Sequence, residues 1–173
     1  MNPPDLYLRS ILHGHLSAVE RQGPLADNFH AHGLWCEALA DFFGIIRMQE
    51  GTRPPQELYL ALIALGVCTV RWAVVLGVDP ERFIEGVENH TLNNTEGVPR
   101  NLHTAYSHLR CHEIHLVANS LKTGPLNLLD AMLTVCALTS VHLVQPMMGD
   151  GFKQVLAEAV VAVDAFRNRE AAR

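Results

Sequence analysis

Long apolar stretches alternate with short breaks at glycine or proline, and no stretch shows the two-residue alternation of a β-strand. The clearest stretch runs from Glu57 to Gly77 and contains one interior charge, Arg71. Asp79 then suits the N-cap of a new helix, and Pro80 suits its first turn, where a missing N–H costs nothing. The pattern predicts helices over about 4–22, 28–49, 55–77, 80–90, 101–122, 126–144 and 150–167. We therefore expect an all-α helical bundle with a four-helix core.

A polar, turn-rich stretch at 91–100 separates two halves that look alike. One half opens with Asn28-Phe29-His30 and the other with Asn101-Leu102-His103. Each half continues as a long helix, a break and a second apolar helix, which is the pattern of a duplicated α-hairpin, although any two amphipathic hairpins share it. We expect a single domain, and the candidate repeats cover 28–90 and 101–167.

Composition narrows the classes of function. Apolar residues make up 49% of the chain and charged residues 18%, which favours a buried interface and predicts a homodimer. The net charge of −5, without a basic run, argues against nucleic-acid binding. The four cysteines fall in predicted helices and no signal peptide is recognisable, so we expect reduced thiols and a cytoplasmic protein. Leu58–Val78 is long enough to span a bilayer, but it contains Arg71 and lacks aromatic or basic flanks, so no membrane insertion is expected.

Two carboxylates four residues apart, Glu37 and Asp41, share one face of the second predicted helix. Like charges at this spacing repel each other, and a divalent cation such as Mg²⁺ would reverse the effect. The alternative is that this face is exposed and that an aromatic face is buried instead. That face comprises Trp35, Leu39, Phe42, Phe43 and Ile46.

Two further carboxylates interrupt apolar patterns in the second half. Glu113 lies within an apolar stripe of the fifth predicted helix, and Asp130 interrupts the apolar run 128–133. A buried carboxylate must be paired, metal-bound or protonated. Asp130 could equally form a salt bridge with Arg71 across the bundle.

The fifth predicted helix also carries the densest group of potential metal ligands: His108, Cys111, His112 and His115. Spacings of three and four place such side chains on one helical face, which suits Zn²⁺ or another metal that prefers imidazole. The alternative is a histidine face at a subunit contact, which titrates near neutral pH. The pairs His13/His15 and His30/His32 are two residues apart, so on a helix their side chains diverge and they are weak metal candidates.

The stretch from Glu57 to Arg100 resembles the MazG-like, all-α nucleoside triphosphate pyrophosphohydrolases. Glu57-Leu58 resembles the family's Glu-Leu-x-Asp motif, and the Leu-Gly-Val-Asp segment at 76–79 resembles its Leu-Gly-Ile-Asp cap. The segment 34–41 lies where the family carries Glu-x-x-Glu. In the second half, Cys-His-Glu-Ile-His at 111–115 followed by Asn-Leu-Leu-Asp at 127–130 looks similar again.

The resemblance implies a Mg²⁺-dependent nucleotide pyrophosphohydrolase. In that family, acids on two antiparallel helices bind Mg²⁺ around the triphosphate, and an activated water attacks and releases pyrophosphate. Carried over by position, the metal ligands would be Glu37, Asp41, Glu57, Glu113 and Asp130. The first three would also be catalytic. Leu60 and Asn127 stand where the family has further acids.

Two alternatives come from other classes of protein. One is a non-catalytic helical protein of the same fold that binds a nucleotide or a protein partner. The other is a metal-binding bundle centred on His108, His112 and His115.

Overall fold

The computed structural model describes residues 3–48, 52, 55–93 and 101–118, together with 131, 132, 134–136 and 138, and within these residues the protein is an all-α helical bundle. This confirms the predicted fold class. The helices are α1 (Pro3–Gln22), α2 (Asn28–Ile46), α3 (Pro55–Val75), α4 (Pro80–Asn93) and α5 (Leu102–Ala118). Further helical residues lie between Ala131 and Leu138.

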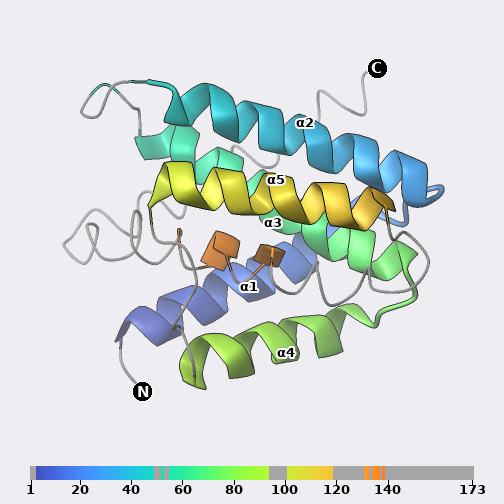
Figure 1. Cartoon of the computed structure of the whole chain (residues 1–173). Coiled ribbons are helices and arrows are strands. Elements are labelled where there is room, and N and C mark those ends of the chain that lie inside the picture. The colour runs from blue at the N-terminus through green and yellow to red at the C-terminus, as the bar shows by residue number, and fades with distance from the viewer. Residues whose placement is uncertain are drawn as a thin grey trace.

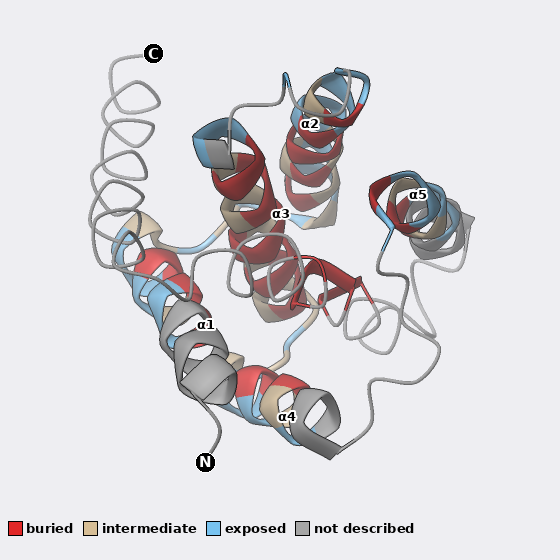
Figure 2. Ribbon diagram, turned by 90° about the vertical axis from the view of Figure 1, so that its left-hand side faces the viewer, coloured by how far each residue is buried: buried red, intermediate tan, exposed pale blue. Residues whose placement is uncertain are grey.

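The long apolar helix α3 lies at the centre of the bundle. It packs against α1, α2 and α4, while α5 packs on α2 and α4 packs on α1 (Figure 1). In the view of Figure 2, buried residues cover the sides of α3 that face its neighbours. The helical residues described within 131–138 lie between α5 and the α1–α4 pair, and all of them are buried. A helix that is apolar on every side therefore takes the position with the most neighbours.

The core is built from large side chains that come from every described helix. Full burial of one such side chain stabilises the fold by about 1.5–3 kcal/mol. The largest fully buried side chains are Trp35, Trp72, Phe42, Leu12, Leu39, Ile46, Leu62, Leu65, Ile84, Leu109 and Met132.

Glycine ends two of the helices. Gly23 follows α1 with φ of 75°, and Gly77 follows α3 with φ of 82°. Residues with a Cβ rarely adopt this left-handed conformation, so glycine is favoured at the position where the helix ends. The amide of Gly23 donates to the carbonyl of Val19 at 3.1 Å, and that of Gly77 donates to Val74 at 2.9 Å. The predicted breaks at these two positions are confirmed.

Aspartate side chains cap the starts of α2 and α4. Asp27 accepts a hydrogen bond from the amide of His30 at 2.8 Å, and Asp79 accepts one from the amide of Arg82 at 2.9 Å. Each bond satisfies one of the amides that a first helical turn leaves without a partner. The N-cap predicted at Asp79 is therefore confirmed.

The helix ends differ from the predicted ranges by a few residues. The second helix ends at Ile46 rather than near Gln49, and the fourth continues to Asn93 rather than ending near His90. Helix ends are the least specified part of such a pattern. The predicted helix at 150–167 and most of that at 126–144 lie outside the described residues, and the second candidate repeat lies largely outside them too.

Candidate functional site

The three predicted catalytic carboxylates lie on the surface. Glu37 and Asp41 are exposed on α2, and Glu57 is exposed in the first turn of α3. At that position a negative charge also interacts favourably with the positive end of the helix dipole. Glu57 therefore has a structural role that does not depend on any ligand.

The other two predicted ligands cannot be placed at a site with these three. Glu113 belongs to α5, but its side chain is outside the described residues, and so is the whole of Asp130. Among the side chains that the structure describes, no three His, Cys, Asp or Glu residues lie where they could hold one metal ion. Glu37, Asp41 and Glu57 consequently do not form such a group by themselves.

The histidine cluster of α5 is described only at its start. His108 is half-buried and Cys111 is exposed. The side chains of His112 and His115 lie outside the described residues. The metal-binding hypothesis for this helix stays a prediction.

The structure confirms most of the aromatic face predicted for α2. Trp35, Leu39, Phe42 and Ile46 are buried, whereas Phe43 is 38% exposed. Phe43 lies about 100° around the helix from Phe42 and about 40° beyond Leu39, outside the buried residues. Phe43 lies at the edge of the stripe.

Polar atoms of two tryptophans connect α2 to α3. The indole of Trp35 donates to the hydroxyl of Thr69 at 3.0 Å, and Thr69 donates to the carbonyl of Leu65 at 2.6 Å. The indole of Trp72 donates to Asn28 at 2.5 Å. Each buried indole N–H therefore has an acceptor, and the two antiparallel helices are held in one register.

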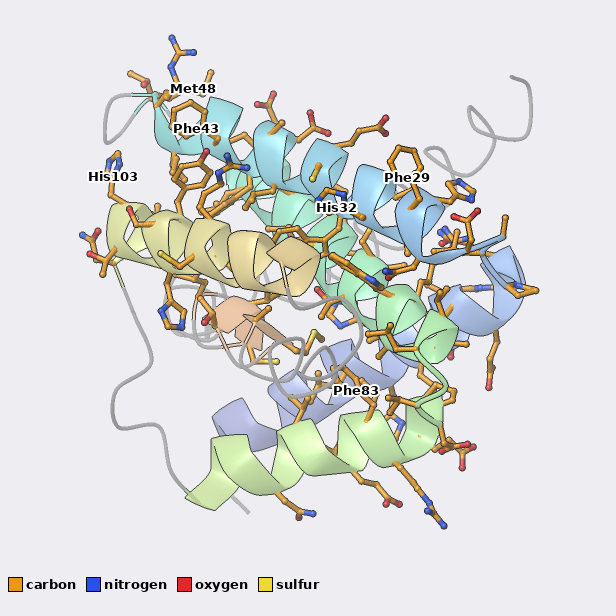
Figure 3. All side chains as sticks on the ribbon, turned by 45° about the vertical axis from the view of Figure 1, so that its right-hand side comes forward. Phe29, His32, Phe43, Met48, Phe83 and His103 are labelled. Atoms are coloured by element: carbon orange, nitrogen blue, oxygen red, sulfur yellow. The ribbon has the colours of Figure 1, made fainter. Side chains whose placement is uncertain are left out.

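A thiol and an imidazole meet on α2 beside these tryptophans. The Sγ of Cys36 lies 3.1 Å from Nε2 of His32, one helical turn away. The His32 ring packs against Trp72 with a centroid separation of 5.5 Å, and Figure 3 labels His32 at this position. This pair was missed at the sequence level, where His32 was considered only beside His30, although its four-residue spacing from Cys36 was a usable signal.

His15 of α1 packs against Gly66 of α3. His15 is 3% exposed, and neither of its ring nitrogens has a hydrogen-bond partner among the described residues. A Cβ on Gly66 would lie 2.6 Å from Cε1 of the ring. Burial lowers the pKa of His15 from its ordinary value of 6.5 to about 4, so the ring is neutral at pH 7.

Arg71, the interior charge of α3, contacts the end of α1. Its Nη2 donates to the carbonyl of Gly23 at 3.5 Å. The carbonyls at a helix end carry partial negative charge, so a guanidinium there is favourably placed. The suggested salt bridge to Asp130 falls outside the described residues.

Large apolar side chains are exposed on and next to α2. Phe29 is 85% exposed, Phe43 is 38% exposed and Met48 is 41% exposed. Figure 3 shows Phe29 near one end of the helix and Phe43 and Met48 near the other, all projecting outward. Phe43 stacks on Tyr106 of α5 at 4.6 Å between ring centroids, and Arg47 lies 5.8 Å from its centroid. Phe29 was not singled out from the sequence, although the helical spacing places it opposite the buried face.

One described helix is long and apolar enough to cross a membrane. Within Gln56–Val75, an 18-residue window has a mean hydropathy of 2.0, and 67% of that window is buried inside the bundle. A central core helix passes the same test, and α3 has that position here.

Comparison with family models, with curated proteins and with solved structures finds no match to this chain.

Proposed function

We propose that this protein is a helical binding protein that contacts another protein chain through the outward face of α2. The observation that carries the proposal is the 85% exposure of Phe29 on a helix whose opposite face is fully packed. Burying a phenylalanine side chain is worth about 1.5–3 kcal/mol. A partner that covers this ring would gain that stabilisation.

A single exposed apolar residue is ordinary on a protein surface, but a group of them on one element is informative. The exposed large apolar residues of the described part are Phe29, Phe43 and Met48, and they all belong to α2 or directly follow it. Phenylalanine and methionine are also enriched at protein interfaces. The grouping supports α2 as the contact surface.

Site-specific photo-cross-linking in the cells that make the protein tests this proposal. A benzophenone amino acid at position 29 should give a cross-linked product, whereas the same group at the exposed position 85 on α4 should give none. The adduct mass measured for position 29 then gives the size of the partner. If position 29 gives no more cross-linked product than position 85, the proposal is overturned.

A Mg²⁺-dependent nucleotide pyrophosphohydrolase is the second candidate. It is supported by the packing of α2 against both α3 and α5, because the resemblance implies acids on neighbouring helices. In this proposal Glu37, Asp41 and Glu57 act together with Glu113 and Asp130 as ligands of Mg²⁺.

Pyrophosphate release from a panel of nucleoside triphosphates with Mg²⁺ or Mn²⁺ tests the enzyme proposal. Release that disappears in Glu37→Gln and persists in Glu85→Gln, an exposed glutamate of α4, would establish it. The absence of release with every nucleotide would refute it.

A further inference from the structure

Cys36 and His32 place a nucleophile beside a base on α2. The Sγ of Cys36 lies 3.1 Å from Nε2 of His32, which is within reach of a hydrogen bond. A separation of four residues brings two side chains together on a helix, so the backbone itself holds this pair in contact. When Nε2 is the unprotonated ring nitrogen, it accepts the proton of the thiol. The sulfur then carries the negative charge that makes it a nucleophile.

A third side chain orients the imidazole. The His32 ring packs on Trp72 of α3, with 5.5 Å between the ring centroids. Trp72 is itself only 2% exposed, and its indole N–H donates to the side chain of Asn28. The His32 ring therefore rests on a fixed surface, which limits its rotation away from the sulfur. A nucleophile, a base in contact with it and a group that orients the base are the parts of an activated thiol.

The thiol lies where a small molecule can approach it. Cys36 is half-buried rather than enclosed. It is seven residues from Phe29 and seven from Phe43, and this spacing places all three on the same side of α2. Both phenylalanines are exposed and project outward (Figure 3), so this side of the helix meets solvent. By contrast, Cys136 is 2% exposed and is shielded in the folded chain.

We infer that Cys36 is a site of thiol–disulfide exchange with small-molecule disulfides, and that His32 is its base. The proton of Cys36 passes to Nε2 of His32, and Sγ attacks one sulfur of the incoming disulfide. The S–S bond of that molecule breaks as the new S–S bond to Cys36 forms, and the departing thiolate takes the proton from His32. The products are a mixed disulfide at Cys36 and one free thiol, so no further oxidant is needed. This chemistry does not require the proposed contact through α2.

The initial rate of mixed-disulfide formation at each cysteine tests the site. The folded full chain is mixed at pH 7 with hydroxyethyl disulfide, a small uncharged probe, and peptide mass spectrometry of acid-quenched samples gives the rates. Cys68 is also half-buried, so burial alone predicts similar rates at Cys36 and Cys68. An ordinary thiol is only a few per cent ionised at pH 7, and a base in contact with it raises that fraction. Cys36 should therefore react about tenfold faster than Cys68. An equal or slower rate at Cys36 would overturn the site.

Replacing His32 separates its chemistry from its packing. His32→Gln removes the base, so the rate at Cys36 should fall on the order of tenfold. If the ring only shields the thiol, the same change uncovers Sγ, and a rate that rises or stays the same would overturn the role of His32. His30→Gln is the matched control, because His30 is exposed on the same helix, two residues away. It should leave the rate at Cys36 unchanged, and an equal fall in this variant would also overturn the role of His32. The rate at Cys68 should be the same in all three proteins, which checks that the variants remain folded.

Discussion

Replacing Gly66 with alanine tests the contact between α1 and α3 most directly. The new Cβ would lie 2.6 Å from Cε1 and 2.8 Å from Nε2 of the His15 ring. The ring has little room to move, because His15 is buried and protein interiors are close-packed. Relieving an overlap of this kind costs about 1–3 kcal/mol of folding free energy.

A second effect of the substitution has the opposite sign. Alanine favours a helix over glycine by about 1 kcal/mol. Gly14→Ala isolates this effect, since Gly14 lies within α1 and a Cβ there would meet no atom within 4 Å. We expect the free energy of unfolding of Gly66→Ala to lie about 1–3 kcal/mol below that of Gly14→Ala. For a chain of this length, each kcal/mol corresponds to about 2–4 °C in Tm.

Urea unfolding followed by circular dichroism at pH 7 and one fixed protein concentration measures these differences. The double variant His15→Ala/Gly66→Ala should be less destabilised than the sum of its single variants, because the methyl group added at position 66 occupies space that the ring vacates. If Gly66→Ala proves as stable as Gly14→Ala, the ring does not contact the α3 backbone and the reasoning is refuted.

Three further predictions follow from the described residues. The His15 ring takes up a proton near pH 6.5 in the unfolded chain but only near pH 4 in the folded chain. The free energy of unfolding should therefore fall by about 2 kcal/mol between pH 7 and pH 5 on account of His15. His15→Leu should lose this dependence in urea titrations, and an unchanged dependence would count against a buried neutral ring. Asp27→Ala should lower the free energy of unfolding by about 1 kcal/mol and Asp27→Asn by less, in the same assay, because asparagine still caps α2; equal losses would argue against the cap. Burial raises the pKa of Cys136 to about 12, so mass spectrometry should find it unalkylated by iodoacetamide until the protein unfolds, while the exposed Cys111 reacts in the folded state; early labelling of Cys136 would contradict its burial.

The helices could be predicted from the sequence because their signals are local. Gly23 and Gly77 adopt the conformation that glycine favours, and Asp79 caps the helix that begins at Pro80. Each of these signals acts within a few residues, so it is visible without knowledge of the packing.

The contacts between helices could not be predicted, because they join residues far apart in the chain. Arg71 contacts Gly23, which is 48 residues away, and His15 packs on Gly66. Helical spacing shows which residues share a face, but it does not show which helix covers that face. For the same reason, the spacing of Glu37 and Asp41 indicated a shared face and left open whether that face was buried.

The contacts of α1 have a consequence for shortened forms of the protein. A product that begins after Gly23 would lose the carbonyl that Arg71 contacts, together with the ring that covers Gly66. The central helix would then present a guanidinium and a bare stretch of backbone to solvent. Such a fragment resembles a folding intermediate and would be a substrate for chaperones and proteases. Tags and truncations at this end should therefore leave α1 intact.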